Sequence, residues 1–242
     1  MHICECVMVI EHHGLIIAIG GGGFTNAVDP DLDAFVLARC PPDRLRVGLV
    51  GIASGDDATK LSRFYAWLAG TGIRASHYET VWTRAESRNW LLDQGLIYVG
   101  GGNTARLITD CRDRGLDEDF ADASRRGAVL AGVSAGGACW FEAMLSDSRG
   151  TGLAPLAGLG LLAGSCCPHY SSEPARRPAF EAAIATAALP EGIAVDDGAA
   201  VLVEAGRPPR AISVRPGAWA YRVASAGPAG NVISEPLVTY AN

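Results

Sequence analysis

The sequence predicts an α/β fold, a three-layer sandwich in which a mainly parallel sheet lies between two layers of helices. Three observations predict it. Short apolar runs alternate along the chain with amphipathic helical segments. The runs are uniformly apolar, as in strands buried on both faces, and several of them end in glycine-rich turns. Strands that alternate with helices form mainly parallel sheets whose two faces are covered by those helices.

The expected strands of this sheet lie in the first part of the chain. Each is a short, mostly apolar run that ends near glycine or polar residues, which is the pattern of a buried strand. They span residues 15–19, 46–52, 73–78, 95–99 and 128–133.

Helices are expected between these strands. After the second strand, apolar residues fall at i, i+3, i+4 and i+7 and so share one face of a helix. These residues are Leu61, Phe64, Tyr65 and Leu68. Two further helices are expected at about 104–114 and 117–126, before the strand that leads to Ser134.

The chain changes character after Gly150, where Gly, Pro and Ala become frequent. One helix is expected at about 175–188, and short strands forming an antiparallel edge are expected over 193–238. No stretch has the composition of a linker, so residues 15–242 are expected to form a single domain. Residues 1–14 do not follow the pattern and are expected to be a frayed extension.

Composition limits the classes of function. The net charge is −6 and the charges are mixed along the chain, which argues against a nucleic acid or an anionic membrane as partner. No apolar stretch approaches the ~20 residues that span a bilayer, and the first residues lack a secretory signal. Seven cysteines without a regular spacing indicate free thiols and a cytoplasmic protein.

No cofactor or metal is expected. Neither glycine cluster completes a nucleotide-binding fingerprint, since residues 20–25 lack the last glycine of G-x-G-x-x-G and no G-K-[ST] follows. Cys4, Cys6, His12 and His13 are rich in ligand atoms but lack the paired spacing of a zinc site.

A serine in a strand-to-helix turn is the candidate nucleophile. The strand at 128–133 enters Gly132-Val133-Ser134-Ala135-Gly136, and an apolar helix is expected from Ala138 onward. In such a nucleophile elbow a tight turn exposes the hydroxyl, and neighbouring glycines remove side chains that would clash. The N-terminus of a following helix offers N–H groups and a positive dipole end to a developing oxyanion.

A serine nucleophile needs a base, and His169 is expected to supply it. Of the five histidines, three lie in the first 13 residues and His77 lies within an expected strand. His169 follows a short apolar segment and so falls in a loop, where an imidazole can reach the top of the sheet. Pattern alone leaves two candidates for the carboxylate that orients this histidine. Asp147 lies between two serines, and Asp197 follows a short apolar strand.

Oxyanion donors are expected from two neighbouring turns. The segment Gly100-Gly101-Gly102-Asn103 is a strand-to-helix turn next to the elbow in the expected sheet. Its backbone N–H groups are expected to face Ser134 and to act together with the N–H of Ala135.

Several motifs together resemble the peptidase E (aspartyl dipeptidase) family, which includes cyanophycinase. The nearest branch is that of the bacterial peptidase E-like proteins. The resemblance covers about residues 16–205 and rests on motifs in the same order along the chain. They are Tyr98-Val99-Gly100-Gly101-Gly102-Asn103-Thr104, Gly132-Val133-Ser134-Ala135-Gly136, Cys167-Pro168-His169-Tyr170 and Asp196-Asp197-Gly198-Ala199.

This resemblance implies a fold similar to that of class I glutamine amidotransferases, and a serine peptidase that acts on small peptides. It implies Ser134 as nucleophile, His169 as base, and Gly102 and Ala135 as oxyanion donors. For the third member it favours Asp197, where the dipeptidase has Glu, with Asp147 as the alternative acid.

Family dipeptidases remove an N-terminal aspartate and use an arginine to bind its side chain. Arg176 or Arg177 falls near that position, although the segment around them departs from the dipeptidase pattern. Asn103 and Tyr170, in the matching motifs, are the other expected substrate-binding residues. The expected partners are a small peptide and a second copy of the chain in a homodimer. The rival functions are an esterase-type acyl hydrolase and a non-catalytic metabolite-binding protein on the same fold.

Overall fold

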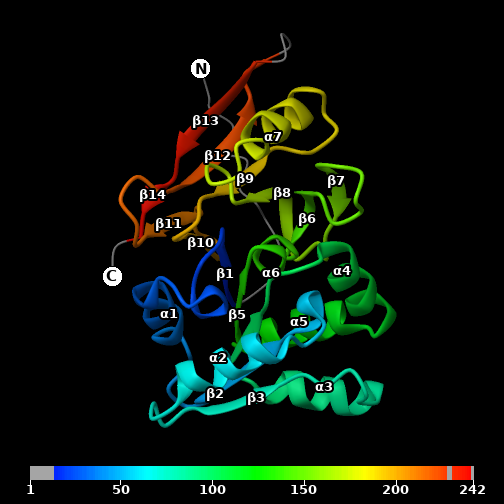
Figure 1. Ribbon diagram of the computed structural model, residues 1–242, viewed down its shortest axis with the longest axis vertical. Helices are drawn as coiled ribbons and strands as arrows, with labels where there is room; N and C mark the ends of the chain where they lie inside the picture. The colour runs from blue at the N-terminus through cyan, green and yellow to red at the C-terminus, as the bar shows by residue number, and fades with distance from the viewer. Residues whose placement is uncertain (1–13, 228–230, 241–242) are drawn as a thin grey trace.

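The computed structural model describes residues 14–227 and 231–240 and contains two β-sheets stacked along the long axis of the molecule (Figure 1). The first sheet has eight strands in the order β14-β11-β10-β1-β5-β4-β2-β3. Its five consecutive parallel strands are β1 (Leu15–Ile19), β5 (Val129–Val133), β4 (Leu96–Val99), β2 (Arg46–Val50) and β3 (Arg74–His77). These five strands lie where the sequence predicts them, within a few residues at each end.

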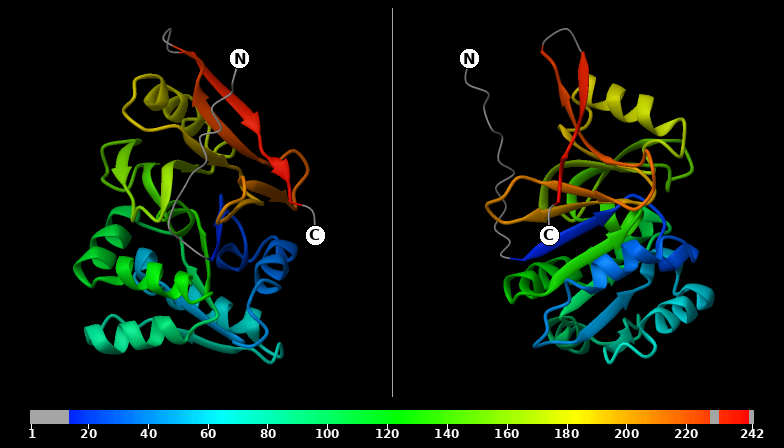
Figure 2. Two further views of the ribbon diagram at one scale, coloured as in Figure 1. Left: turned by 180° about the vertical axis from the view of Figure 1, so that it is seen from behind. Right: turned by 90° about the vertical axis from the view of Figure 1, so that its left-hand side faces the viewer.

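Helices cover both faces of the parallel strands, as the side view in Figure 2 shows. Alternate residues of β1 point to opposite faces, so Ile17 and Ile19 pack in one hydrophobic cluster while Ile16 and Ala18 pack in the other. The first cluster includes α1 (Pro30–Leu37) and α2 (Ala58–Leu68); the second includes α3 (Arg84–Asp93), α4 (Thr104–Asp113) and α5 (Leu116–Arg125). The α/β layering predicted from the sequence is therefore confirmed for this part of the chain.

The second sheet corrects the prediction of one mainly parallel sheet. It has six strands and carries α7 (Arg176–Ala185) on one face. In sheet order the strands are β13 (Val232–Pro236), β12 (Ala220–Ser225), β9 (Gly192–Val195), β8 (Leu162–Pro168), β6 (Phe141–Ser146) and β7 (Ala154–Ala157). The central strands β6, β8 and β9 are parallel. β7 pairs antiparallel to β6, β12 pairs antiparallel to β9, and β13 pairs antiparallel to β12.

The prediction of a helix from Ala138 onward is wrong. The elbow continues only as α6 (Ala135–Ala138), and β6 begins three residues later. Two adjacent glycines explain the short helix, because each disfavours a helix interior by about 1 kcal/mol. Both are required by close packing: a Cβ on Gly136 would lie 2.0 Å from the Val99 carbonyl oxygen, and one on Gly137 would lie 2.9 Å from that of Gly132.

The short strands expected over 193–238 divide between the two sheets. β10 (Ala199–Glu204), β11 (Arg210–Ser213) and β14 (Val238–Thr239) extend the first sheet, with β10 antiparallel to β1. The antiparallel edge is thus confirmed for β10 and β11, whereas β14 pairs parallel to β11. β9 and β10 follow one another along the chain but belong to different sheets, so the chain crosses from one sheet to the other at Asp196 and Asp197.

One hydrophobic cluster runs continuously between the sheets. It joins residues of the first sheet, such as Val99 and Leu130, to Trp140, Phe141 and Ile193 next to or within the second. Within the described residues, no helix combines the length and apolar character needed to cross a membrane. The N-terminal residues up to His13, with the cysteines and histidines considered above for a metal site, lie outside the described part of the chain.

Candidate active site

Ser134 follows β5 directly and has a strained backbone. Its φ of 55° and ψ of −118° lie outside the regions that non-glycine residues favour. The turn needs this conformation because the chain folds back on itself: a Cβ on Gly132 would lie 2.1 Å from the Gly136 carbonyl oxygen. The Ser134 N–H donates to the Ile19 carbonyl oxygen at 2.9 Å, which ties the turn to β1. The hydroxyl therefore projects from the carboxyl end of the parallel strands.

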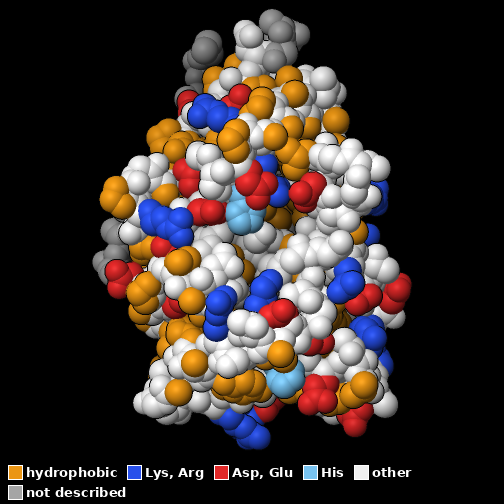
Figure 3. Space-filling model, viewed as in Figure 1, with side chains coloured by type: hydrophobic (Ala, Val, Ile, Leu, Met, Phe, Trp, Pro, Cys, Tyr) orange, Lys and Arg blue, Asp and Glu red, His pale blue; other side chains and the backbone are white. Residues whose placement is uncertain are grey.

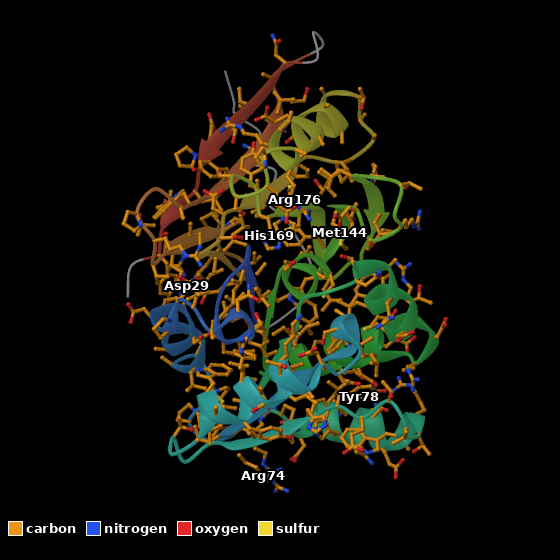
Figure 4. All side chains as sticks on the ribbon, in the orientation of Figure 1. Asp29, Arg74, Tyr78, Met144, His169 and Arg176 are labelled. Carbon is orange, nitrogen blue, oxygen red and sulfur yellow. The ribbon has the colours of Figure 1, made fainter. Side chains whose placement is uncertain are left out.

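His169 and Asp197 come from the second sheet and complete a hydrogen-bonded chain. His169 follows β8, and Asp197 follows β9 by two residues. His169 Nε2 lies 2.8 Å from Ser134 Oγ, and His169 Nδ1 lies 2.6 Å from Asp197 Oδ1. His169 lies in the middle of the molecule, between the two sheets (Figure 4). Like Ser134, it has a positive φ, of 56°.

Gly21 joins the two halves of this arrangement. It pairs with Asp197 in an isolated parallel bridge, and its carbonyl oxygen accepts from the Gly198 N–H at 2.9 Å. A Cβ on Gly21 would lie 2.1 Å from Asp197 Oδ1 and 2.7 Å from His169 Cε1. Glycine is therefore required here for a close approach, because any side chain would push the carboxylate and the imidazole away from Ser134.

Asp197 is held in its ionised form. Partial burial acts to raise its pKa, but the hydrogen bond and charge of His169, with help from Ser172 and Arg215, outweigh burial and lower the pKa below its usual value. Arg215 is itself fixed by two hydrogen bonds of 2.7 and 2.6 Å to the Asp29 carboxylate. An ionised Asp197 accepts a hydrogen bond from the Nδ1–H of His169, which leaves Nε2 free to take a proton from Ser134.

The glycine turn after β4 borders the serine. A Cβ on Gly101 would lie 3.1 Å from Ser134 Cβ, so this turn packs directly against the elbow. Gly102 has a φ of +151°, and a Cβ there would lie 2.3 Å from the Ala53 carbonyl oxygen. In the described part of the chain, we see no hydrogen bond from the N–H of Gly102 or of Ala135. Of the two residues, Gly102 lines the pocket and Ala135 is buried behind Ser134 in the elbow.

The serine and histidine open into a pocket of about 200 Å³. This volume suits a small substrate. Its lining residues are Gly21, Thr25, Asn26, Lys60, Gly101, Gly102, Val133, Ser134 and His169. Figure 3 shows two pale blue histidine side chains on this face, and red and blue charged side chains lie around the upper one.

Among the described residues, Asp147, the alternative acid, forms no hydrogen bond or ion pair with the histidine. Its side chain is 65 % exposed and lies 4.0 Å from the Arg176 guanidinium, at the far end of β6. The histidine contacts Asp197 instead. Of the two acids that the sequence leaves open, only Asp197 has the geometry of an orienting carboxylate.

Two expected substrate-binding residues have structural roles instead. The Tyr170 ring is fully buried in the core under α7, and its hydroxyl donates to Glu181 at 2.9 Å. Arg177 is exposed, forms an ion pair with Glu181 at 3.0 Å, and stacks over the Tyr170 ring. Neither residue lines the pocket, because Tyr170 packs under α7 and Arg177 belongs to that helix.

The other two expected substrate-binding residues are also engaged elsewhere. Arg176 is buried, pairs with Glu173 at 2.6 Å and donates to the Leu145 carbonyl oxygen. Asn103 caps α4 by accepting from the Arg106 N–H and donates to the Ser148 carbonyl oxygen. Neither is among the pocket-lining residues.

Sequence reasoning missed three residues of the lining. Thr25 and Asn26 belong to a short 3-10 turn (Phe24–Asn26) after β1, and Lys60 belongs to the first turn of α2. None of them lies in a catalytic motif. They reach the pocket only because the loop after β1 and the first turn of α2 both border the elbow.

A serine on a strained strand-to-helix turn, hydrogen-bonded to a histidine that is hydrogen-bonded to a carboxylate, is the arrangement of a serine hydrolase. The model of peptidase family S51 matches residues 16–208 of the chain. The chain belongs to this family and is a serine-type peptidase.

Known proteins agree with this assignment. The chain is 39 % identical over 212 residues to the uncharacterized peptidase YgaJ of Bacillus subtilis (strain 168), covering 86 % of this chain and 91 % of that protein. A shorter stretch of 41 residues is 49 % identical to peptidase E of Escherichia coli, covering 17 % of this chain and 18 % of that protein.

Two solved structures share the fold. A peptidase from an acI-B1 Actinobacterium superposes with a TM-score of 0.71 at 15 % identity, covering 96 % of this chain and 97 % of that one. A putative peptidase E from Listeria monocytogenes EGD-e superposes with a TM-score of 0.62 at 17 % identity, covering 84 % and 99 %. At these identities the likeness concerns the fold alone.

Proposed function

We propose that the protein is a dipeptidase that cleaves small peptides through a Ser134–His169–Asp197 triad and an acyl-enzyme. The hydrogen-bonded chain of 2.8 and 2.6 Å beside the pocket carries this proposal. A fold like that of class I glutamine amidotransferases and a cytoplasmic location belong to the same proposal. The buried free thiols among the described cysteines support the location.

In this mechanism His169 Nε2 takes the hydroxyl proton while Ser134 Oγ attacks the scissile carbonyl carbon. Asp197 keeps the imidazole in the tautomer that has Nε2 free and stabilises the imidazolium that forms. The imidazolium then gives its proton to the leaving amine, and the peptide bond breaks. Water, deprotonated by the same nitrogen, hydrolyses the ester and restores the serine.

The oxyanion is stabilised by individual N–H groups of Gly102 and Ala135. Because α6 has only four residues, a helix dipole contributes little behind the elbow. Each N–H donor of this kind is worth about 3 kcal/mol of transition-state stabilisation. The open donors on both residues support the assignment.

The substrate is proposed to be a short peptide because the pocket has only about 200 Å³. Cleavage after an N-terminal aspartate belongs to this proposal. The arginines expected to bind the aspartate side chain, Arg176 and Arg177, form ion pairs with Glu173 and Glu181 instead. The aspartate preference therefore depends on another cation.

Ser134→Ala tests the proposed function. We expect it to fold like the wild type and to lose at least about 10³-fold in peptide turnover. A fluorophosphonate probe should label the wild type on Ser134 and leave the variant unlabelled. Wild-type rates in Ser134→Ala would exclude the mechanism. Faster cleavage of aryl esters than of every dipeptide would favour the esterase, and no labelling of folded wild type would favour a binding protein.

A further inference from the structure

Lys60 is the only lysine among the 20 basic residues of the chain; the other 19 are arginines. This single ammonium lines the pocket that holds Ser134 and His169. Basic residues elsewhere in the structure, such as Arg84, Arg88 and Arg215, form ion pairs with carboxylates. The only ammonium side chain among these basic residues thus lies in the same pocket as the proposed nucleophile.

The position of Lys60 is fixed from both ends. Its backbone N–H donates to the Asp57 side chain at the start of α2, at 3.0 Å. Its Nζ donates to the Gly101 carbonyl oxygen at 3.0 Å, across the pocket from its own helix. Gly101 packs against Ser134. The side chain therefore spans from α2 to the glycine turn, and its ammonium lies close to the reacting serine.

The charge of this ammonium is not neutralised. Its acceptor is a neutral carbonyl, and within the described residues no carboxylate lies within ion-pair distance of Lys60. An ammonium has three N–H donors, so two remain after the bond to Gly101. The half-buried setting removes part of the water that would otherwise screen the charge. An anionic group is the natural occupant of the space in front of it.

Three of the arginines in this part of the molecule are held by carboxylates and cannot take this role as they stand. Arg176 is held by Glu173, and Arg177 by Glu181. Arg215 is bound through two hydrogen bonds to Asp29. Each would have to leave a carboxylate partner before it could bind a substrate.

We propose that Lys60 binds a carboxylate of the peptide substrate and so selects peptides that carry one close to the scissile bond. This inference rests on the proposed peptidase function and identifies the cation on which its specificity depends. The carboxylate has two possible sources in a dipeptide, an acidic side chain on the first residue or the free C-terminus. Both present the same two oxygens to the ammonium.

Four peptides distinguish the two sources. Asp-Leu amide against Asn-Leu amide varies only the side-chain carboxylate, and Ala-Leu against Ala-Leu amide varies only the C-terminal one. Binding is measured by calorimetry in the Ser134→Ala protein, so that turnover is not needed. We expect one pair to differ in Kd by about 10- to 100-fold, which is the range for a charge-assisted hydrogen bond.

Lys60→Met should abolish that difference while leaving the other pair unchanged. Lys60→Arg should keep part of it, because the charge is retained. The matched control is Arg74→Met, which removes one positive charge from the end of the molecule opposite to α7 (Figure 4). In wild-type background the same loss should appear in KM and much less in kcat.

Three results would overturn the inference. One is an equal Kd within both peptide pairs in the Ser134→Ala protein. Another is a preference that survives Lys60→Met. The third is an equal weakening of all four peptides by Lys60→Met, which would indicate that the lysine only supports the glycine turn. These outcomes are separate from failure of the proposed function, which is decided by the activity of Ser134→Ala alone.

Discussion

The two sides of the pocket are built in different ways. On the nucleophile side, Gly21, Gly101 and Ser134 follow adjacent parallel strands of the first sheet, and a tight local turn orients the serine. On the base side, His169 and Asp197 follow strands of the second sheet. The nucleophile is therefore oriented by its own backbone, whereas the base is oriented by how the two sheets meet.

The helices beside the two sides of the pocket, α2 and α7, also differ in how they are held: α2 by a local hydrogen bond, and α7 by packing against a sheet. The N-cap residue of α2 is Asp57, whose side chain accepts from the Lys60 N–H, so the start of the helix is fixed by a local hydrogen bond. α7 begins at Arg176, and its N-cap residue, Ala175, provides no side-chain hydrogen bond. This helix is held by burial of Phe180 and Ile184 against the second sheet. A substitution that removes one local hydrogen bond on the nucleophile side should therefore have a small effect. Substitutions where the two sheets meet, such as at Gly21, should have the largest effect on the orientation of His169 and Asp197.

Asp197→Asn should have the largest effect on the base side. The amide cannot hold His169 in the productive tautomer, so turnover should fall by about 10³- to 10⁴-fold with little loss of stability. Peptide hydrolysis at pH 7 to 8 is the measurement. Asp147→Asn is the matched control and should stay within a few-fold of wild type. A larger loss for Asp147→Asn would reverse the choice of acid.

Gly21→Ala tests the junction directly. The new methyl group would lie 2.1 Å from Asp197 Oδ1 and 2.7 Å from His169 Cε1, so both groups must move. A displacement near 1 Å costs about 10²-fold in rate. Gly206→Ala is the control, since Gly206 has a φ of +72° but nothing within 4 Å of its added Cβ. It should lose stability without losing kcat; equal kcat losses in the two variants would contradict the junction role of Gly21.

Asp33, in α1 on the nucleophile side, should make the folding stability of the protein depend on pH. Burial, opposed by a hydrogen bond from the Phe24 backbone, raises its pKa from 3.8 to about 7. The folded protein therefore keeps a proton that the unfolded chain releases, so stability should fall as pH rises from about 4 to 7 and then level off.

Asp33→Asn should remove this dependence. The gain at pH 8 should be on the order of 2 kcal/mol, because an amide does not have to ionise in the buried site. Urea unfolding at pH 5 and pH 8 measures it. Asp31→Asn, on the same helix, serves as control and should leave the wild-type slope. A wild-type stability that does not change between pH 5 and 8 would argue against a raised pKa.

Asp57→Ala should have the smallest effect. Loss of the cap on α2 costs about 1 kcal/mol of folding free energy. Thermal unfolding should show a decrease of a few degrees, which Asp57→Asn largely restores because its amide oxygen also caps. If Asp57→Asn were as unstable as Asp57→Ala, the charge and not the cap would hold the start of α2.

The sequence predicts the first sheet well because its strands are continuous apolar runs with clear ends. β1, β4 and β5 are such runs, and each leads into glycines or into Ser134. The sequence does not predict the second sheet, because its strands are not all continuous apolar runs. β8 contains Gly164, Ser165 and Pro168, and its pairing with β6 and β9 depends on contacts that no local pattern carries.

The residues of the site differ in the same way in how far the sequence predicts them. Ser134 follows from a local motif, and His169 and Asp197 were found by elimination and resemblance; the structure brings all three together. Lys60 lies 41 residues from Gly101 along the chain, and only the packing of α2 brings its Nζ to that carbonyl. Tyr170 adjoins His169 in the matching motif, but the chain turns at His169, whose φ is 56°, and the Tyr170 ring packs in the core under α7.

The positive φ angles of Ser134 and His169, 55° and 56°, have a consequence for how such a sequence can change. Glycine adopts these angles without strain, whereas a serine or histidine costs about 1–3 kcal/mol. Ser134→Gly should therefore melt above the wild type while hydrolysing nothing. Selection for thermal tolerance alone would favour glycine at both positions, so any redesign of this protein for stability must hold them constant.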